Sequence, residues 1–373
     1  MIGNGSNERN VRKNGNNEME RTEQNGNRTG DSLMSKKTNK EASRGTGKEV
    51  GKGAGKGINC ITGKGAGKEV NRKTGKGAGK EVNRKTGKGA KVQHKEPLIR
   101  HEVFALFISP THNTEKAVRA LASGIAKEVS SKDYFAIDLT SFDSRDTDFD
   151  FEEGDIVILA SPTYAGRVPN KLMPYFKESV FGNGALGISL VTYGNRAYDD
   201  SLKELSYIMS ENEFEVTAAV AVPSEHAFVP QLAQGRPNEA DLKELFELGT
   251  KIGREILNHK TTKVDLKSIP GNSPDAMVYY VPKKEDGTPA SFLKAMPITD
   301  SLKCSGCGEC KAVCPMNCFA NSVLEPEGIC IKCQGCIKAC PESAKHFENE
   351  DFESHQEYLK NNYSEIVREI EVI

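Results

Sequence analysis

Nine of the ten cysteines in this chain lie between Cys304 and Cys340, in two runs with the same spacing. Each run reads C-x2-C-x2-C-x3-C-P, the first starting at Cys304 and the second at Cys330. Such closely spaced thiolates suit a [4Fe-4S] cluster, and in the bacterial form of this motif the fourth cysteine of each run binds the other cluster. We therefore assign two ligand sets: Cys304, Cys307, Cys310 and Cys340 for a first centre, and Cys330, Cys333, Cys336 and Cys314 for a second.

Zinc and disulfide bonds are the alternative uses of clustered cysteines. Zinc prefers two separated pairs of ligands, whereas each run offers three close thiolates and a fourth before proline. A secreted disulfide domain needs a signal peptide, and residues 1–9 contain no apolar segment of that kind. The spacing therefore favours iron–sulfur clusters. Cys318 stands outside both runs and is interpreted as a small buried apolar residue rather than a ligand.

Residues 301–348 resemble a bacterial two-cluster ferredoxin through these two runs. The resemblance implies an α+β ferredoxin-like fold and transfer of single electrons at low potential. Small residues between the cysteines let backbone N–H groups approach the cluster sulfurs, and such hydrogen bonds help to set the potential. The small residues concerned are Ser305, Gly306, Gly308 and Gly335.

Residues 1–96 form a basic segment that differs from the rest of the chain. They hold 23 Lys and Arg against 10 Asp and Glu, so the remaining residues hold 28 against 42. A twelve-residue repeat from Gly63 to Thr74 recurs unchanged from Gly75 to Thr86. Because this repeat is rich in Gly, Asn and Lys, it cannot bury enough apolar surface to fold, and we expect a disordered tail. Binding of the tail to nucleic acid by charge attraction is the less favoured interpretation.

Residues 98–258 alternate between apolar runs typical of buried strands and helix-like stretches. This alternation predicts an α/β fold with a doubly wound, five-stranded parallel sheet, whose ligands bind at the carboxyl ends of the strands. The strands are expected at 103–108, 135–139, 156–160, 186–192 and 216–222. The helices are expected at 115–130, 170–180, 199–210 and 239–257.

Three loops follow these strands and carry side chains that suit a ligand. Residues 109–114 lead into a helix, where hydroxyls and free N–H groups favour a phosphate. Residues 161–169 and 192–200 each place an aromatic side chain beside small residues, which suits a flat ring. Each loop taken alone is equally consistent with an ordinary turn or helix cap.

Together the three loops resemble flavodoxin, and residues 98–348 resemble the bacterial flavodoxin–ferredoxin fusion family, in which a flavodoxin-like domain precedes the two-cluster domain. The resemblance is to the short-chain type, and it implies that FMN is bound. Its phosphate would contact Ser109, Thr111, Asn113 and Thr114, and its ring would lie beside Thr163, Tyr164, Ala165 and Gly166. The second flavin loop would consist of Tyr193, Gly194, Asn195, Tyr198 and Asp199.

His112 departs from the flavodoxin pattern, which usually has glycine at this position of the phosphate loop. Glycine there allows a positive φ or a close approach of the backbone, and histidine adopts such a conformation only at some cost. The imidazole can alternatively add a hydrogen-bond donor to the phosphate. The sequence leaves both interpretations open.

The remaining segments connect and extend these parts. Residues 259–300 are expected to form a partly ordered linker with several Pro and Gly residues. Residues 349–373 are expected to form a C-terminal amphipathic helix that packs on the core. There is no run of eighteen apolar residues, so we expect no membrane span. Reduced cysteines and oxygen-sensitive clusters indicate the cytoplasm of an organism with anaerobic tendencies.

The leading functional hypothesis is an electron relay between two [4Fe-4S] clusters, FMN and a redox partner, namely a ferredoxin- or flavodoxin-linked oxidoreductase. The first alternative is an FMN-dependent reductase that acts on a small molecule or on nicotinamide, in which His226 could donate a proton. We favour the interpretation that His226 has a structural role rather than a catalytic one. The second alternative is an iron–sulfur redox sensor whose tail binds nucleic acid.

Overall fold

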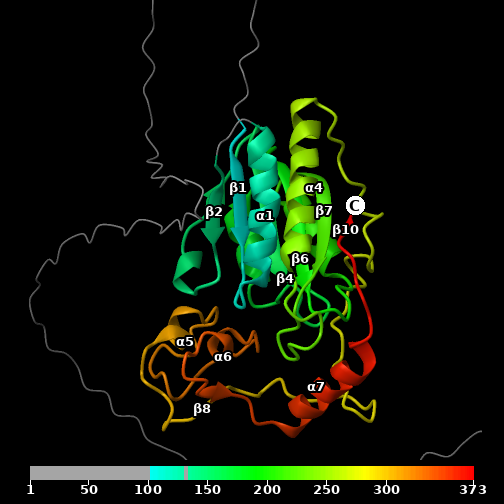
Figure 1. Cartoon of the computed structure of the whole chain (residues 1–373). Coiled ribbons are helices and arrows are strands. Elements are labelled where there is room, and N and C mark those ends of the chain that lie inside the picture. The colour runs from blue at the N-terminus through cyan, green and yellow to red at the C-terminus, as the bar shows by residue number, and fades with distance from the viewer. Residues whose placement is uncertain (1–100, 130–132) are drawn as a thin grey trace, which may run out of the picture. The chain divides into compact units, whose positions relative to one another are not determined.

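The structure is a computed structural model, and it describes residues 101–129 and 133–373 (Figure 1). The basic tail predicted for residues 1–96 lies outside the described residues. Within them, no helix has both the length and the apolar character needed to cross a membrane.

A six-stranded sheet forms the centre of the α/β part, in the order β10-β7-β6-β4-β1-β2 (Figure 1). Five of these strands run parallel to one another. Taken in chain order, the parallel strands are arranged 2-1-3-4-5, which is the flavodoxin-like version of the doubly wound fold. This confirms the predicted fold of this part. The parallel strands are β1 (Val103–Phe107), β2 (Phe135–Asp138), β4 (Ile156–Pro162), β6 (Leu186–Tyr193) and β7 (Glu215–Pro223).

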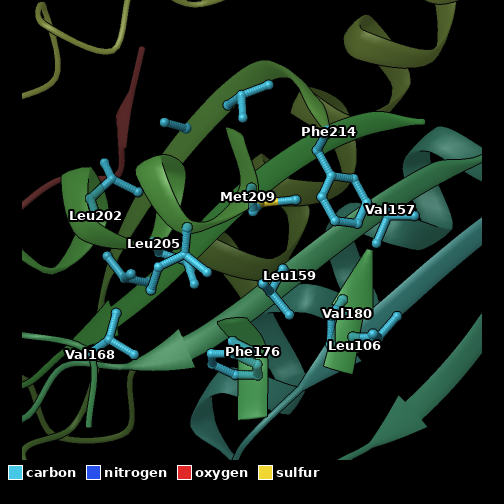
Figure 2. Packing of buried hydrophobic residues seen from close by; sticks show 14 of the residues in the cluster. Leu106, Val157, Leu159, Val168, Phe176, Val180, Leu202, Leu205, Met209 and Phe214 are labelled. Atoms are coloured by element: carbon cyan, nitrogen blue, oxygen red, sulfur yellow. The ribbon is translucent and has the colours of Figure 1, made fainter. Parts of the chain in front are cut away.

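Helices cover both faces of this sheet. On one face, α1 (Asn113–Glu128) and α4 (Glu239–Leu257) pack on a buried cluster that contains Phe107 and Ile158. On the other face, α2 (Met173–Ser179) and α3 (Ser201–Glu211) pack on the cluster shown in Figure 2. There Phe176 from α2 and Leu205 and Met209 from α3 lie over Leu159 of β4 (Figure 2). Shorter elements are η1 (Asp143–Arg145), β3 (Phe149–Asp150) and β5 (Val180–Phe181).

The C-terminal segment differs from its prediction. The helix expected over residues 349–373 ends early, as α7 (Glu350–Tyr363), and the chain then forms β10 (Glu371–Val372), a sixth strand that pairs antiparallel with β7. Ile370 packs on one core cluster and Ile373 on the other. A strand places residues three apart on opposite faces, whereas a helix would place them on the same face. Pairing with β7 also satisfies backbone groups at an otherwise open sheet edge.

The cysteine-rich part contains two short helices and a small ribbon. The helices are α5 (Glu309–Ala312) and α6 (Gly335–Lys338). The ribbon pairs β8 (Ile298–Thr299) antiparallel with β9 (Lys345–His346). The ribbon therefore joins the residues before the first cysteine run to those after the second.

Two glycines allow α1 and α4 to pack closely. A Cβ atom at Gly124 of α1 would lie 2.1 Å from the carbonyl oxygen of Phe246, and one at Gly249 of α4 would lie 2.2 Å from the carbonyl oxygen of Leu121. The backbones therefore touch at positions where no side chain fits.

We expect Gly124→Ala to lower the free energy of unfolding by about 1–3 kcal/mol, because the added methyl group forces the two helices apart. This loss opposes the gain in helix propensity of about 1 kcal/mol that alanine brings. Chemical denaturation under anaerobic conditions measures the change. Ser123→Ala, on the half-exposed face of the same turn, is the control and should stay within about 0.5 kcal/mol of the wild type. Equal stability of the two variants would contradict the close packing.

Candidate functional site

The two cysteine runs share one backbone conformation. Gly306 and Gly308, two and four residues after Cys304, have φ values of 73° and 84°. Lys332 and Gln334 occupy the same places after Cys330, with φ values of 55° and 64°. Each run then enters its short helix, α5 or α6, five residues after its first cysteine. The repeat seen in the sequence is therefore also a repeat in the structure.

The repeat continues beyond the fourth cysteine of each run. Asn317 and Ser343 have positive φ values of 53° and 49° at matching places. The next N–H group then turns back to the sulfur, so that Cys318 donates to Cys314 Sγ and Ala344 donates to Cys340 Sγ, both at 3.3 Å. Cys318 thus occupies the position that Ala344 fills in the other half.

Cys318 has the surroundings of a buried packing residue. It is buried beside Phe319, and its thiol donates to the carbonyl oxygen of Ile329 at 3.3 Å. Cys314 Sγ instead accepts the backbone N–H of Cys318, and donors of this kind stabilise a thiolate, the form that binds iron.

All nine cysteines between Cys304 and Cys340 are free thiols, so none of them forms a disulfide bond. Across residues 101–129 and 133–373, no group of three or more His, Cys, Asp or Glu side chains is arranged to hold a single metal ion. A [4Fe-4S] cluster makes a different demand, because each of its thiolates binds a different iron. The assignment of clusters rests on the spacing and the repeated backbone, and not on a preformed ion site.

The second run lies against the carboxyl edge of the parallel sheet. A Cβ atom at Gly335 would lie only 3.1 Å from the carbonyl oxygen of Pro110, which is in the loop after β1. Lys338 of α6 pairs with Glu225, after β7, at 2.7 Å. These contacts bring the second run to the loops that sequence reasoning selected for a cofactor.

Residues next to Cys314 and Cys330 also contact the α/β part. The Arg145 guanidinium holds the loop after β2 by donating to the carbonyl oxygens of Leu139 and Thr140 at 2.7 and 2.9 Å, and it also donates to the carbonyl oxygen of Pro315. Met316 and Ile331 pack on the core cluster that contains Leu159. The ligands assigned to the second centre are therefore flanked by residues that dock on the α/β part.

Tyr164, in the loop after β4, lies at this interface. Its pKa is raised well above its ordinary value, mainly by burial, with smaller contributions from the nearby Cys333 and Cys330. The phenol thus stays protonated and lies within the electrostatic influence of two cysteines of the second run. It links the predicted ring site with the second predicted centre.

The predicted phosphate loop, residues 109–114, follows β1 and ends in the first turn of α1. Ser109 is buried, and its Oγ accepts a hydrogen bond from the Glu115 N–H at 2.9 Å, which leaves the hydroxyl hydrogen able to donate. Thr114 shares a hydroxyl hydrogen bond of 2.7 Å with Thr192. Asn113 donates to the carbonyl oxygen of Glu225 at 3.2 Å. The structure therefore brings Ser109, Asn113 and Thr114 together at one helix end.

His112 adopts the positive φ that the glycine of the family pattern suggests, with a value of 63°. Its ring is mostly exposed and pairs with Glu115 at 2.9 Å. The histidine therefore fits the backbone of the loop, and its side chain is engaged with α1.

The two predicted ring loops touch each other. Asp200 donates its N–H to the carbonyl oxygen of Gly166 at 2.9 Å, and a Cβ atom at Gly166 would collide with the Asp199 carboxylate at 2.3 Å. Thr163 shares a hydroxyl hydrogen bond of 2.7 Å with Ser201. The loops after β4 and β6 are thus held together, and their role as two sides of a flavin site stays a prediction.

The linker and the C-terminal segment cover these loops. Tyr280 donates its N–H to the carbonyl oxygen of Ala165 at 2.8 Å, and its ring lies 3.9 Å from the Arg196 guanidinium carbon. Asn195 donates to the carbonyl oxygens of Tyr363 and Ile366 at 3.1 and 2.8 Å. The predicted ring site is therefore closed by residues far away in the sequence.

The Tyr280 hydroxyl is buried and has no hydrogen-bond partner in the described part of the chain. Burial is the main cause that raises the pKa of Tyr280 to about 12, so the hydroxyl keeps its hydrogen. A buried hydroxyl without a partner is costly, which makes it a candidate to contact a ligand.

A pocket of about 350 Å³ opens beside the second ring loop. Its walls include Tyr193, Tyr198, Asn272, Arg368 and Glu371. Sequence reasoning placed the two tyrosines here but missed the other three, because they come from the linker and the C-terminal segment. Nothing in their local sequence distinguishes them from ordinary surface residues.

His226 is a structural histidine. Its Nδ1 atom accepts N–H hydrogen bonds from Phe228 and Val229 at 3.0 and 3.3 Å. The ring packs so closely on Gly194 that a Cβ atom there would lie 2.4 Å from it. Burial, with smaller contributions from nearby positive groups, lowers its pKa to about 3. The imidazole is therefore neutral at pH 7, and the structure supports a structural role for this residue rather than a role as a proton donor.

The chain was compared with protein-family models, curated proteins and solved structures. No protein-family model and no curated protein matches the chain. Among solved structures, a flavodoxin from the domain Archaea is 16% identical over 42% of this chain and 99% of its own, with a TM-score of 0.28. A short-chain flavodoxin associated with a non-canonical PDU bacterial microcompartment is 10% identical over 43% and 99%, with a TM-score of 0.30.

The flavodiiron core of Flv1 from Synechocystis sp. PCC6803 is 17% identical over 43% of this chain, with a TM-score of 0.31, and the match spans 37% of that protein. Because these TM-scores are all below 0.5, the fold assignment rests on the strand order. Any function is inferred from the site.

The neutral state of His226 predicts a pH dependence of stability. Because its pKa is about 3 in the folded chain and about 6.5 in the unfolded chain, the unfolded chain binds one more proton between these pH values. Stability contributed by the neutral ring is present above pH 6.5 and is lost as the pH falls towards 3. We expect a slope of up to about 1.4 kcal/mol per pH unit from this residue.

Urea unfolding between pH 7 and pH 5 tests this expectation against His226→Asn, which keeps an acceptor but does not titrate. The difference between the two proteins isolates His226 from other groups, including His355, whose pKa is also lowered by burial. The variant should show the smaller slope. Parallel curves would mean that His226 is accessible to protons.

Proposed function

We propose that this protein is an electron carrier in which two [4Fe-4S] clusters exchange electrons with FMN and with a redox partner. The observation that supports the proposal most strongly is the contact between Gly335, in the second cysteine run, and Pro110, in the predicted phosphate loop. Gly335 precedes Cys336, a ligand in the proposal, and Pro110 lies in the loop that would bind the flavin phosphate, so the proposed cofactors would be neighbours. Such proximity is what transfer of electrons between the two cofactors requires.

The cysteine-rich part fits two clusters. Its two halves repeat the same backbone, and N–H groups from Cys318 and Ala344 donate to the sulfurs of Cys314 and Cys340. Donors of this kind stabilise thiolate ligands and tune a bound cluster. Cys304, Cys307, Cys310 and Cys340 would hold the first cluster, and Cys330, Cys333, Cys336 and Cys314 the second.

The α/β part offers suitable groups for both ends of FMN. At the phosphate end, Ser109 retains a hydroxyl hydrogen to donate, beside Thr111 and the first turn of α1. At the ring end, Tyr280 binds Ala165 through its backbone N–H, and its buried hydroxyl has no hydrogen-bond partner among the described residues. These features support FMN as the ligand.

The two predicted centres differ in exposure, which suggests which centre faces a redox partner and which lies next to the flavin. Cys307 of the first set is exposed, whereas Cys333 and Cys336 of the second set are buried. When bound, the clusters supply single-electron steps and FMN can take up one or two electrons. Cys307 would mark the side open to a partner, and Tyr164 would separate the second set from the ring site.

The partner would be a ferredoxin- or flavodoxin-linked oxidoreductase, as in the flavodoxin–ferredoxin fusion family that the sequence resembles. Beyond residue 96 the chain carries 42 acidic against 28 basic residues. A negative body favours weak, electrostatically guided docking on a positive partner surface.

The pocket of about 350 Å³ favours a second candidate, an FMN-dependent reductase for a small molecule. Its walls combine the rings of Tyr193 and Tyr198 with the guanidinium of Arg368. Turnover of a small acceptor by a chain that has lost its clusters would favour this candidate. The redox-sensor alternative depends on residues 1–96, which lie outside the described residues.

A pair of buried cysteine variants tests the relay. We expect Cys336→Ala to lose about half of roughly eight irons per chain, because it removes a ligand of the second cluster. It should also slow the reduction of bound FMN by reduced ferredoxin, which absorbance of the flavin records in a stopped-flow instrument.

Cys318→Ala is the matched control, because it also removes a buried thiol but only converts its position to the alanine found at Ala344. It should keep the full iron content and the wild-type rate. Equal iron loss in both variants would overturn the ligand assignment, and an unchanged flavin rate in Cys336→Ala would overturn the relay.

A further inference from the structure

Lys345 is a buried lysine whose charge no carboxylate of residues 101–129 or 133–373 neutralises. Its side chain leaves the β9 strand and is only 4% exposed. The Nζ atom donates to Thr299 Oγ1 at 2.6 Å and to the carbonyl oxygen of Val323. In the described part of the chain, Lys345 makes no ion pair with an Asp or Glu side chain. A buried ammonium group with only neutral partners is costly, so a nearby negative charge is expected.

The surroundings of the ammonium group point to the cysteines as its partners. The Nζ atom lies 4.1 Å from the centre of the Phe319 ring. Phe319 in turn packs in one buried cluster with Cys310, Cys314 and Cys336. The lysine therefore belongs to the layer of side chains that surrounds both predicted ligand sets.

Packing connects Lys345 to one cysteine of each set. Its ammonium group is hydrogen-bonded to the Cys310 side chain. The Phe319 ring beneath the ammonium group packs with both Cys310 and Cys336. Because Cys310 is assigned to the first centre and Cys336 to the second, the lysine lies close to both.

We propose that Lys345 is the shared counter-charge of the two clusters, a fixed cation that raises both reduction potentials. The inference rests on the proposed function, since it requires clusters at the assigned cysteines. Four thiolates give a [4Fe-4S] centre a net negative charge, and reduction adds one more. A buried cation nearby stabilises the more negative state, because little water screens the interaction.

The sequence alone does not reveal this role. Lys345 follows Ala344 outside both cysteine runs, and its counterpart in the first half is Phe319. The two halves of the cysteine-rich part therefore differ at this position, and a single lysine lies near the ligands of both centres.

Potentiometric titration of the full chain under anaerobic conditions, followed by electron paramagnetic resonance, tests the proposal. Lys345→Met removes the charge and keeps much of the apolar stem. We expect the reduction potential of each centre in Lys345→Met to fall by at least about 59 mV. At the potential where a wild-type centre is half reduced, the oxidised-to-reduced ratio of the variant would then be at least about tenfold higher. Both centres should shift. Lys345→Arg, which retains the charge, should stay near the wild type.

Lys303→Met is the matched control, because Lys303 neighbours the ligand Cys304 but its side chain is 62% exposed. Solvent screens such a charge, so its removal should move neither potential appreciably. Unchanged potentials in Lys345→Met, or an equal shift in Lys345→Arg, would overturn the proposal, the second by showing that packing matters rather than charge.

Iron counting separates this proposal from the proposed function. A wild-type chain without iron would defeat the clusters themselves, whatever Lys345 does. If Lys345→Met folds by circular dichroism but binds no iron while Lys345→Arg binds it, the need for a cation is supported directly. Loss of iron from both variants would contradict the proposal, because the charge would then be insufficient to retain the clusters.

Discussion

The close contact of Gly335 with Pro110 is the constraint on which the site depends. At this point a cysteine run meets the first loop at the carboxyl edge of the parallel sheet, with no room for a larger residue without displacement. The Lys338 to Glu225 ion pair and the Arg145 to Pro315 hydrogen bond secure the same interface. Because the loops of a doubly wound sheet converge at this edge, one docking contact brings a metal-binding run and a ligand-binding edge together.

The docking contact also explains one sequence difference between the two cysteine runs. The place of Gly335 is taken by Glu309 in the first run. Conversely, the positive φ positions are glycines in the first run but Lys332 and Gln334 in the second, where both side chains are buried. Lys332 and Gln334 adopt a positive φ at some conformational cost, and their buried side chains pack within the protein. The first run has glycines at these positions, next to the exposed Cys307.

The sequence predicted the parallel sheet because buried strands read as short apolar runs, and it predicted α4 with its observed ends. It did not predict β10, because Ile366, Ile370 and Ile373 also fit a helical spacing and only the open edge of β7 decides between the two. The loops of the candidate site were found from their position after strands. Tyr280, Arg368 and Lys345 were not, since their roles arise from contacts between distant segments. The cofactor roles of the site residues stay predictions.

The most direct test of the account is to purify the full chain anaerobically and count iron, sulfide and FMN per chain, with spectra before and after dithionite. The account predicts about eight irons, about eight sulfides and about one FMN, with both chromophores bleached on reduction. Eight irons without flavin would reduce the protein to a two-cluster carrier whose α/β part binds something else. A chain with zinc in place of iron, or with no sulfide, would contradict the central claim.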